Sequence, residues 1–144
     1  MASTPFRGRI PGDRLYDVEH DMWVRREEGA VRVGATAFGI HRAGEIIGFT
    51  AKPKGAEVER GRGLATVECA KTVLAVRTPV SGTVLDTNEA AEEAPAMLNR
   101  DPYEVGWMAR LRPASWDEES AFLVDAVAYR AHVTRVEPGA EIQP

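Results

Sequence analysis

The sequence contains few of the residues that disulfide bridges and metal sites require. It has one cysteine, Cys69, and three histidines in 144 residues. A single cysteine cannot form an internal disulfide or a multi-cysteine metal site, so the fold does not depend on an oxidising compartment. His20, His41 and His132 lie far apart in the chain and form no HxxxH or HExxH pattern. We therefore expect no metal site.

Long apolar runs and an excess of positive charge are also missing. No stretch approaches the roughly 18 consecutive apolar residues of a membrane span, and residues 1–15 lack the apolar segment of a secretory signal. The 18 basic and 22 acidic side chains give a formal net charge of −4. Binding to nucleic acid requires clustered lysine and arginine. The sequence thus predicts a cytoplasmic protein that binds neither nucleic acid nor a membrane.

The usual enzyme motifs are absent as well. The segment GRG at 61–63 lacks the third glycine and the strand-to-helix setting of a dinucleotide-binding loop. The segment VSG at 80–82 does not match the GxSxG pattern of a nucleophile elbow. Residues 86–104 carry six acidic side chains and one basic side chain, which is typical of a solvated loop. We therefore expect no catalytic residues and a chain that is not an enzyme.

The chain consists mainly of short β-like runs. Its length is that of one ordinary domain. From Met22 onward, runs rich in valine, isoleucine and threonine are separated by turn residues such as Gly29 and Gly55. The expected strands are 22–26, 30–35, 44–49, 63–70, 72–77, 82–86 and 106–112. This succession predicts a compact barrel or sandwich of mainly antiparallel strands.

Helices are expected at a few places between and after these strands. A short helix is predicted over residues 36–43 and another helical turn near 94–99. Ser115 and Glu118 have the spacing of a capping box at a helix N-terminus. Apolar residues then recur at helical spacing, and Asp125 is a candidate cap for a second helical segment.

These elements predict an α+β, mainly β fold with a C-terminal helical segment. Residues 1–15 contain proline and glycine without periodicity and are expected to form a flexible arm. Residues 135–144 are expected to form a flexible tail. The folded domain is therefore expected to span residues 16–134.

Lysine is rare, which draws attention to Lys71. Fifteen of the 18 basic residues are arginine, and the lysines are Lys52, Lys54 and Lys71. Lys71 lies between two expected strands, whereas Lys52 and Lys54 lie in a proline-containing turn. A lysine at a hairpin tip presents its amine to solvent from a rigid base, as a modifying ligase and a tethered prosthetic group require. From composition alone, an ordinary solvated lysine is the favoured interpretation.

The residues around Lys71 resemble a known family. The pattern GxxxATVExxK ends at Lys71, and PVSGxV begins eight residues later. NRDPYEVGWMARLRP at 99–113, VGATAFGIHRAGEI at 33–46 and DAVAYRAHV at 125–133 follow the same family's order. Over residues 16–133 the chain resembles the H-protein of the glycine cleavage system, a lipoyl-bearing carrier.

The resemblance implies a fold, a cofactor and several partners. It implies a lipoyl-domain fold of the barrel-sandwich hybrid type, with lipoate in amide linkage to Lys71. Biotin carriers share this fold type, but their lysine lies between methionines, whereas Ala70 and Thr72 flank Lys71. Such a carrier has no catalytic residue of its own. The implied partners are a lipoate-attaching ligase, dihydrolipoamide dehydrogenase and the enzymes that load and unload the arm.

Two departures from the family pattern bear on the cargo. In the family, a cationic aminomethyl group is sheltered by an acidic residue directly before the N-terminal tryptophan and by an aspartate four residues after the lysine. Here Met22 precedes Trp23, Ala75 stands four residues after Lys71, and Asp21 is one position away. A pocket without a carboxylate suits a neutral cargo better than a cation.

Two further residues, Glu68 and Cys69, complete the expected surroundings of the arm together with Met22 and Ala75. Cys69 stands two residues before Lys71, where many family members have serine. It is either a small buried core residue or a thiol close enough to exchange with the lipoyl disulfide.

The departures favour a carrier whose arm on Lys71 shuttles a sulfur-containing intermediate and electrons between partner enzymes of a sulfur-oxidation pathway, among them a heterodisulfide-reductase-like complex. In this respect the chain resembles the H-protein-like lipoate-binding proteins of sulfur-oxidising prokaryotes. The alternative is the H-protein of the glycine cleavage system, which shuttles the aminomethyl group from glycine decarboxylase to aminomethyltransferase. A third possibility is a non-lipoylated interaction protein of the same fold.

Overall fold

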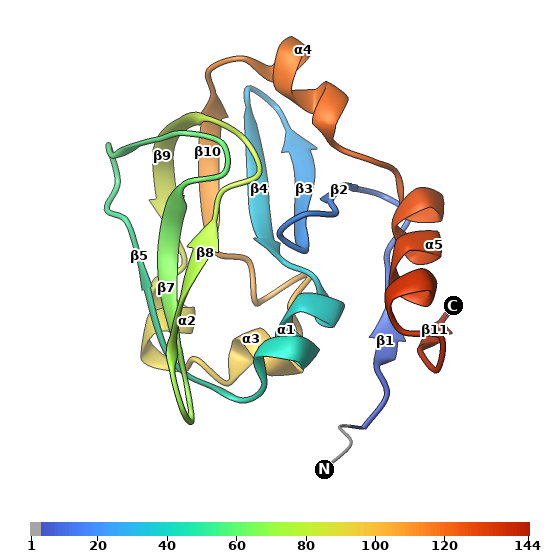
Figure 1. Cartoon of the computed structure of the whole chain (residues 1–144). Helices are drawn as coiled ribbons and strands as arrows, with labels where there is room; N and C mark the ends of the chain where they lie inside the picture. Colours follow the sequence, from blue (N-terminus) through green and yellow to red (C-terminus); the bar gives the residue numbers. More distant parts are fainter. Residues whose placement is uncertain (1–3) are drawn as a thin grey trace.

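The computed structural model describes residues 4–144, and Figure 1 shows how its elements are arranged. The strands are β1 (Arg7–Arg9), β2 (Leu15–Asp17), β3 (Met22–Glu27), β4 (Ala30–Ala35), β5 (Ile46–Ala51), β6 (Glu57–Val58), β7 (Gly63–Cys69), β8 (Val73–Arg77), β9 (Gly82–Thr87), β10 (Ala109–Pro113) and β11 (Glu141–Gln143). The helices are α1 (Ala37–Ala43), α2 (Glu89–Glu93), α3 (Met97–Arg100), α4 (Trp116–Glu119), the 3-10 helix η1 (Ser120–Phe122) and α5 (Ala126–Val136).

Two antiparallel sheets enclose the main core. One sheet has the strand order β2-β3-β4-β10-β9-β6, and the other has the order β5-β7-β8. Figure 1 shows the β5-β7-β8 sheet facing the larger one. Val24 and Val33 of the larger sheet and Phe49 and Val67 of the smaller sheet are buried in the same apolar cluster. The predicted α+β, mainly β class is confirmed.

The strand β3 buries side chains on both of its faces. Met22 and Val24 belong to the core between the two sheets. Trp23, which points to the opposite face as successive strand residues do, belongs to a second cluster that also contains Tyr16 and Tyr129. The larger sheet is therefore covered on one face by the smaller sheet and, at β2 and β3, on the other face by α5.

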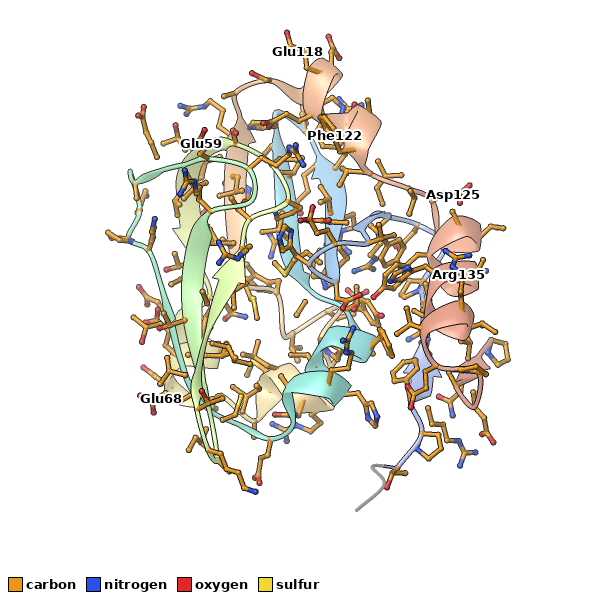
Figure 2. All side chains as sticks on the ribbon, in the orientation of Figure 1. Glu59, Glu68, Glu118, Phe122, Asp125 and Arg135 are labelled. Carbon is orange, nitrogen blue, oxygen red and sulfur yellow. The ribbon has the colours of Figure 1, made fainter. Side chains whose placement is uncertain are left out.

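The C-terminal helix α5 forms as the sequence predicts. The side chain of Asp125 accepts a hydrogen bond from the backbone N–H of Ala128 at 2.9 Å and so caps the helix. Figure 2 shows Asp125 at the start of α5. Ala126, Tyr129 and Val133, at helical spacing, form the buried face of the helix. This face carries Tyr129 into the second cluster.

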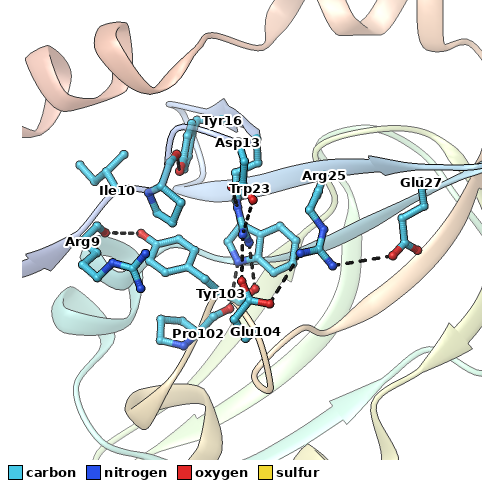
Figure 3. Close-up of polar contacts among 12 residues, drawn as sticks. Arg9, Ile10, Asp13, Tyr16, Trp23, Arg25, Glu27, Pro102, Tyr103 and Glu104 are labelled. Atoms are coloured by element: carbon cyan, nitrogen blue, oxygen red, sulfur yellow. Dashed lines mark hydrogen bonds and ion pairs between the residues drawn. The ribbon is translucent and has the colours of Figure 1, made fainter. Parts of the chain in front are cut away.

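A buried polar network fixes the position of β3. The indole N–H of Trp23 donates to the carbonyl of Pro102 at 3.0 Å. The guanidinium of Arg14, which is 5% exposed, donates to the carbonyl of Tyr103 at 2.8 Å and pairs with Glu104 at 3.2 Å. Figure 3 shows Trp23, Tyr103 and Glu104 in this network. These partners compensate the cost of burying a charge and tie β2 and β3 to the loop after α3.

The two ends of the chain correct the prediction of a flexible arm and a flexible tail. The strands β1 and β11 pair in parallel, with Arg7 opposite Glu141. Phe6 and Ile10 are each 2% exposed and lie in the second cluster. Residues 4–15 and 135–144 are thus part of the packed domain. Residues 1–3 of the predicted arm lie outside the described residues.

Two local predictions also need correction. Ser115 stands at the N-cap of α4, but its side chain makes no capping hydrogen bond. The neighbouring Glu119, rather than Glu118, forms side-chain hydrogen bonds, and it forms them with Ser81. Its carboxylate accepts from the Ser81 backbone N–H at 2.7 Å and from the Ser81 hydroxyl at 2.8 Å. Within residues 86–104, where the charge pattern predicts a loop, the structure has the short helix α2. The helix α3 in the same stretch overlaps the helical turn predicted near 94–99.

No helix within residues 4–144 is long and apolar enough to cross a membrane. The same residues hold no group of three or more histidine, cysteine, aspartate or glutamate side chains that could bind a metal ion.

Candidate functional site

Lys71 lies at the tip of the hairpin that joins β7 and β8. The two backbone hydrogen bonds between Cys69 and Thr72 close the turn, with N···O distances of 2.8 and 3.4 Å. Ala70, Lys71 and Thr72 are exposed. Figure 1 shows this hairpin extending past the helices α1, α2 and α3. The geometry presents the Lys71 amine to solvent on a short, hydrogen-bonded turn.

The other two lysines lie at the opposite end of the same sheet. Ile46, at the start of β5, pairs with Cys69 beside the hairpin tip, whereas Ala51, at its end, pairs with Ala65. Lys52 and Lys54 follow Ala51 in an exposed turn and are therefore remote from the hairpin tip. Lys71 and the other lysines thus differ in their structural setting.

A cavity of about 190 Å³ lies along the free edge of β8. Strand β8 is the edge strand of its sheet, and four consecutive residues, 74–77, line the cavity. Because successive strand side chains point to opposite faces, four in a row indicate a cavity beside the strand edge. Its first residue, Leu74, is three residues from Lys71, about 10 Å of extended chain.

The remaining wall of the cavity is mostly apolar and comes from both sheets and from α1. The apolar residues that line it, besides those of β8, are Met22, Ala35, Ile40, Ala43, Ile46, Val67 and Met108. Gly39, His20, Asp21 and Arg77 complete the lining. The Arg77 guanidinium donates to the carbonyl of Gly61 at 3.1 Å.

The four residues expected around the arm lie in three different places. Met22 and Ala75 line the cavity together. Cys69 is buried in the core at 9% exposed, in agreement with its interpretation as a small core residue. Glu68 is exposed on the outer side of the three-stranded sheet, as Figure 2 shows. Strand alternation separates Glu68 from the cavity, because its neighbour Val67 is the residue that faces inward.

Asp21 places an acidic residue in the cavity lining, where the sequence pattern predicts none. It lines the cavity directly before Met22, and its side chain is 13% exposed. Its backbone has φ of 55°, in the left-handed region that aspartate tolerates better than most residues. The backbone carbonyl of Asp21 accepts from the N–H of Thr36 at 2.9 Å. The prediction of a cavity lining without an acidic residue is therefore wrong.

The carboxylate of Asp21 is held by two side chains. The hydroxyl of Tyr129 donates to Oδ1 at 2.7 Å, and Arg42 Nη1 lies 3.5 Å from Oδ2. Burial raises the pKa of Asp21 above its usual value, and the Tyr129 hydrogen bond and the charge of Arg42 oppose this rise. The sequence offers no local signal for Tyr129, because it reaches Asp21 from 108 residues further along the chain.

Comparisons with known proteins agree on one family. The family model "Glycine cleavage H-protein" matches residues 14–136. Glycine cleavage system H protein 5 of Aquifex aeolicus is 36% identical over 122 residues, which cover 82% of each chain. The glycine cleavage system H protein of Anaeromyxobacter sp. strain K is 37% identical over 89% of this chain and 98% of its own.

The solved structures agree with this match. The crystal structure of a glycine cleavage system H protein from Mycobacterium marinum superposes with a TM-score of 0.76. It is 32% identical to this chain, and the superposition covers 85% of this chain and 97% of the other. The likeness therefore extends over nearly the whole of that fold.

Proposed function

Because this chain belongs to the glycine cleavage H-protein family, we propose that it carries an aminomethyl group from glycine decarboxylase to aminomethyltransferase on lipoate attached to Lys71. Members of the family are carriers rather than enzymes, and they hold lipoate covalently on a lysine. The lipoyl group supplies a dithiolane whose sulfurs take up and release the cargo. The chain itself presents, shelters and exposes that group.

The setting of Lys71 supports it as the attachment site. Its side chain is exposed at a hairpin tip, so a ligase can reach the amine without unfolding the sheet. The lining of the cavity beside β8 begins at Leu74, three residues after Lys71. Its apolar wall, including Met22 and Ala75, suits the hydrocarbon part of a tethered group, because apolar surface gains by leaving water.

Asp21 is the observation that carries the choice of cargo. An ammonium in an apolar cavity is costly unless a carboxylate pairs with it. Asp21 is the acidic residue of the cavity lining, one position before the place where the family pattern has its acid, and we assign this role to its carboxylate. The cavity therefore combines an apolar wall for the arm with one negative group for a cationic cargo.

The sulfur-oxidation hypothesis receives no such support. Its main physical argument was a cavity without a carboxylate, and Asp21 removes that argument. The relatives reported above are all described as glycine cleavage H proteins. We therefore do not propose a heterodisulfide-reductase-like complex as a partner. A lipoate-attaching ligase and dihydrolipoamide dehydrogenase remain proposed partners, and the cytoplasmic location remains a prediction.

A loading assay tests the proposed function. Lipoylated chain is incubated with glycine decarboxylase and carboxyl-labelled glycine, and the labelled CO2 released is measured. We expect release of about one equivalent per lipoylated chain and none above background with the unlipoylated chain. Equal release from both forms, or none from either while an established H-protein is active in the same assay, would contradict the proposal.

A further inference from the structure

The Asp21 carboxylate is one end of a hydrogen-bond chain that begins at α1. The N–H of Gly39 donates to Thr36 Oγ1 at 3.0 Å. Thr36 Oγ1 lies 2.7 Å from the Tyr129 hydroxyl oxygen, which in turn lies 2.7 Å from Asp21 Oδ1. A carboxylate only accepts hydrogen bonds. The Tyr129 proton must therefore point to Asp21, and the Thr36 proton must point to Tyr129.

Tyr129 is held rigidly in this chain. Its side chain is fully buried at 0% exposed, and its ring stacks on Tyr16 with centroids 4.6 Å apart and ring planes 2° from parallel. Burial and the nearby Asp21 charge raise the pKa of Tyr129, so its hydroxyl keeps its proton. A fixed, protonated donor in a buried site favours the ionised form of its acceptor.

The other groups that influence the Asp21 carboxylate act through their charges rather than through hydrogen bonds. Arg42 of α1 is 57% exposed on its side chain, so solvent screens its charge. His132 of α5 and Asp17 of β2 also act on the Asp21 carboxylate through their charges. His20, which lines the cavity, has its Nδ1 3.0 Å from an oxygen of Asp17. Tyr129 is thus the buried neutral donor that bonds directly to Asp21.

We propose that Tyr129 of α5 is a positioning residue that keeps the Asp21 carboxylate ionised and oriented at the wall of the cavity. This inference rests on the proposed function, because the cargo that needs the carboxylate is the cationic aminomethyl group. It assigns to the C-terminal helix a part in cargo retention, although the helix lies behind the cavity wall. Helix α5 thus contacts Asp21 through Tyr129, and Asp21 in turn lines the cavity.

The test compares Tyr129→Phe with the matched control Tyr16→Phe. Both variants remove one hydroxyl from the same ring stack, and the Tyr16 hydroxyl donates to the carbonyl of Pro11 rather than to Asp21. The first measurement is the titration of the Asp21 carboxyl carbon by NMR in the unloaded protein. We expect its midpoint to move to higher pH in Tyr129→Phe and to stay in place in Tyr16→Phe.

The second measurement is the release of the aminomethyl cargo from the loaded, lipoylated chain as a function of pH. Hydrogen bonds to charged groups are among the stronger ones in proteins. We therefore expect release at neutral pH to be about tenfold faster in Tyr129→Phe, with the loss of retention beginning at higher pH than in the parent. In Tyr16→Phe the release rate should stay within about twofold of the parent.

The outcomes separate this inference from the proposed function. An unchanged Asp21 titration in Tyr129→Phe, or an equal shift in both variants, overturns the positioning role. A shifted titration with unchanged release supports the positioning role and contradicts the proposed cationic cargo. If Tyr129→Phe does not fold, Thr36→Val removes the hydroxyl that donates to Tyr129, and a shift of the Asp21 titration in the same direction is then expected.

Discussion

Lys71→Ala is expected to abolish lipoylation of this chain completely. The amine of Lys71 is the group that the lipoyl carboxyl would acylate, and no neighbouring lysine can replace it because Lys52 and Lys54 lie at the other end of the sheet. Intact mass after treatment with a lipoate ligase should show one lipoyl group on the parent and none on the variant. Loading by glycine decarboxylase should be lost with it.

Three controls accompany this prediction. Lys71→Arg should also stay unmodified, because a guanidinium remains protonated and is a poor acyl acceptor. The double variant Lys52→Ala with Lys54→Ala should be lipoylated like the parent. Because Lys71 is exposed, the alanine variant should melt within about 2–3 °C of the parent. A lipoyl group retained in Lys71→Ala would contradict the assignment of Lys71 as the attachment site and would point to Lys52 or Lys54.

Asp21→Asn is expected to shorten cargo retention by about 10- to 100-fold at neutral pH. The substitution removes the negative charge from the cavity wall and keeps the size and shape of the side chain. Asparagine also tolerates the left-handed backbone of this position, where φ is 55°. The effect should therefore come from the charge and not from a rearranged turn. The measurement is the rate at which the loaded chain releases its cargo.

The same variant should not lose stability at neutral pH. Burial raises the pKa of Asp21 in the folded protein above its reference value of 3.8. The Asp21 carboxyl therefore binds a proton more tightly in the folded state than in the unfolded state. The protonated carboxyl contributes its full stabilisation below the unfolded-state pKa, and this contribution is lost as pH rises through the folded-state pKa. At neutral pH the ionised carboxylate costs stability, and the neutral amide of the Asp21→Asn variant avoids that cost. Unfolding by denaturant should show a free energy equal to or above that of the parent.

Ala75→Asp is the matched gain-of-charge control. Ala75 is exposed and lines the cavity, so an added carboxylate there stays solvated and should lengthen cargo retention. Met22 is unsuitable for this purpose, because it is 2% exposed and a glutamate in its place would bury a charge. Unchanged retention in both Asp21→Asn and Ala75→Asp would contradict a role for charge in the cavity.

The sequence predicts those parts of the fold that depend on local patterns. Strands β3 and β4, the helix α1 and the lysine at a hairpin tip follow from apolar runs, turn residues and spacing that lie within a few residues of one another. Asp125 caps α5 as predicted because capping requires only the next helical turn. The Ser115 capping box is wrong, because the Ser115 side chain makes no capping hydrogen bond. The neighbouring Glu119 instead accepts hydrogen bonds from Ser81, which is distant in sequence.

The parts that the sequence does not predict depend on long-range pairing. The strands β1 and β11 have three residues each and pair only because the two chain ends meet, so neither shows a recognisable strand pattern. Asp21 reaches the cavity through a left-handed backbone turn, which alternation along a strand does not anticipate. For its partner Tyr129, the helical spacing predicts only a buried position on a helix. The sequence-based expectation of a cavity lining without an acid overlooked this one turn.

The most direct test of the account is the mass of the Lys71 peptide after one round of loading. The lipoylated chain is incubated with glycine and glycine decarboxylase, digested, and the peptide that contains Lys71 is measured. The account predicts that lipoyl-Lys71 gains one aminomethyl group, and that Asp21→Asn loses this group faster than the parent. A peptide that stays unchanged with glycine and gains mass only after incubation with thiosulfate or another sulfur donor would contradict it.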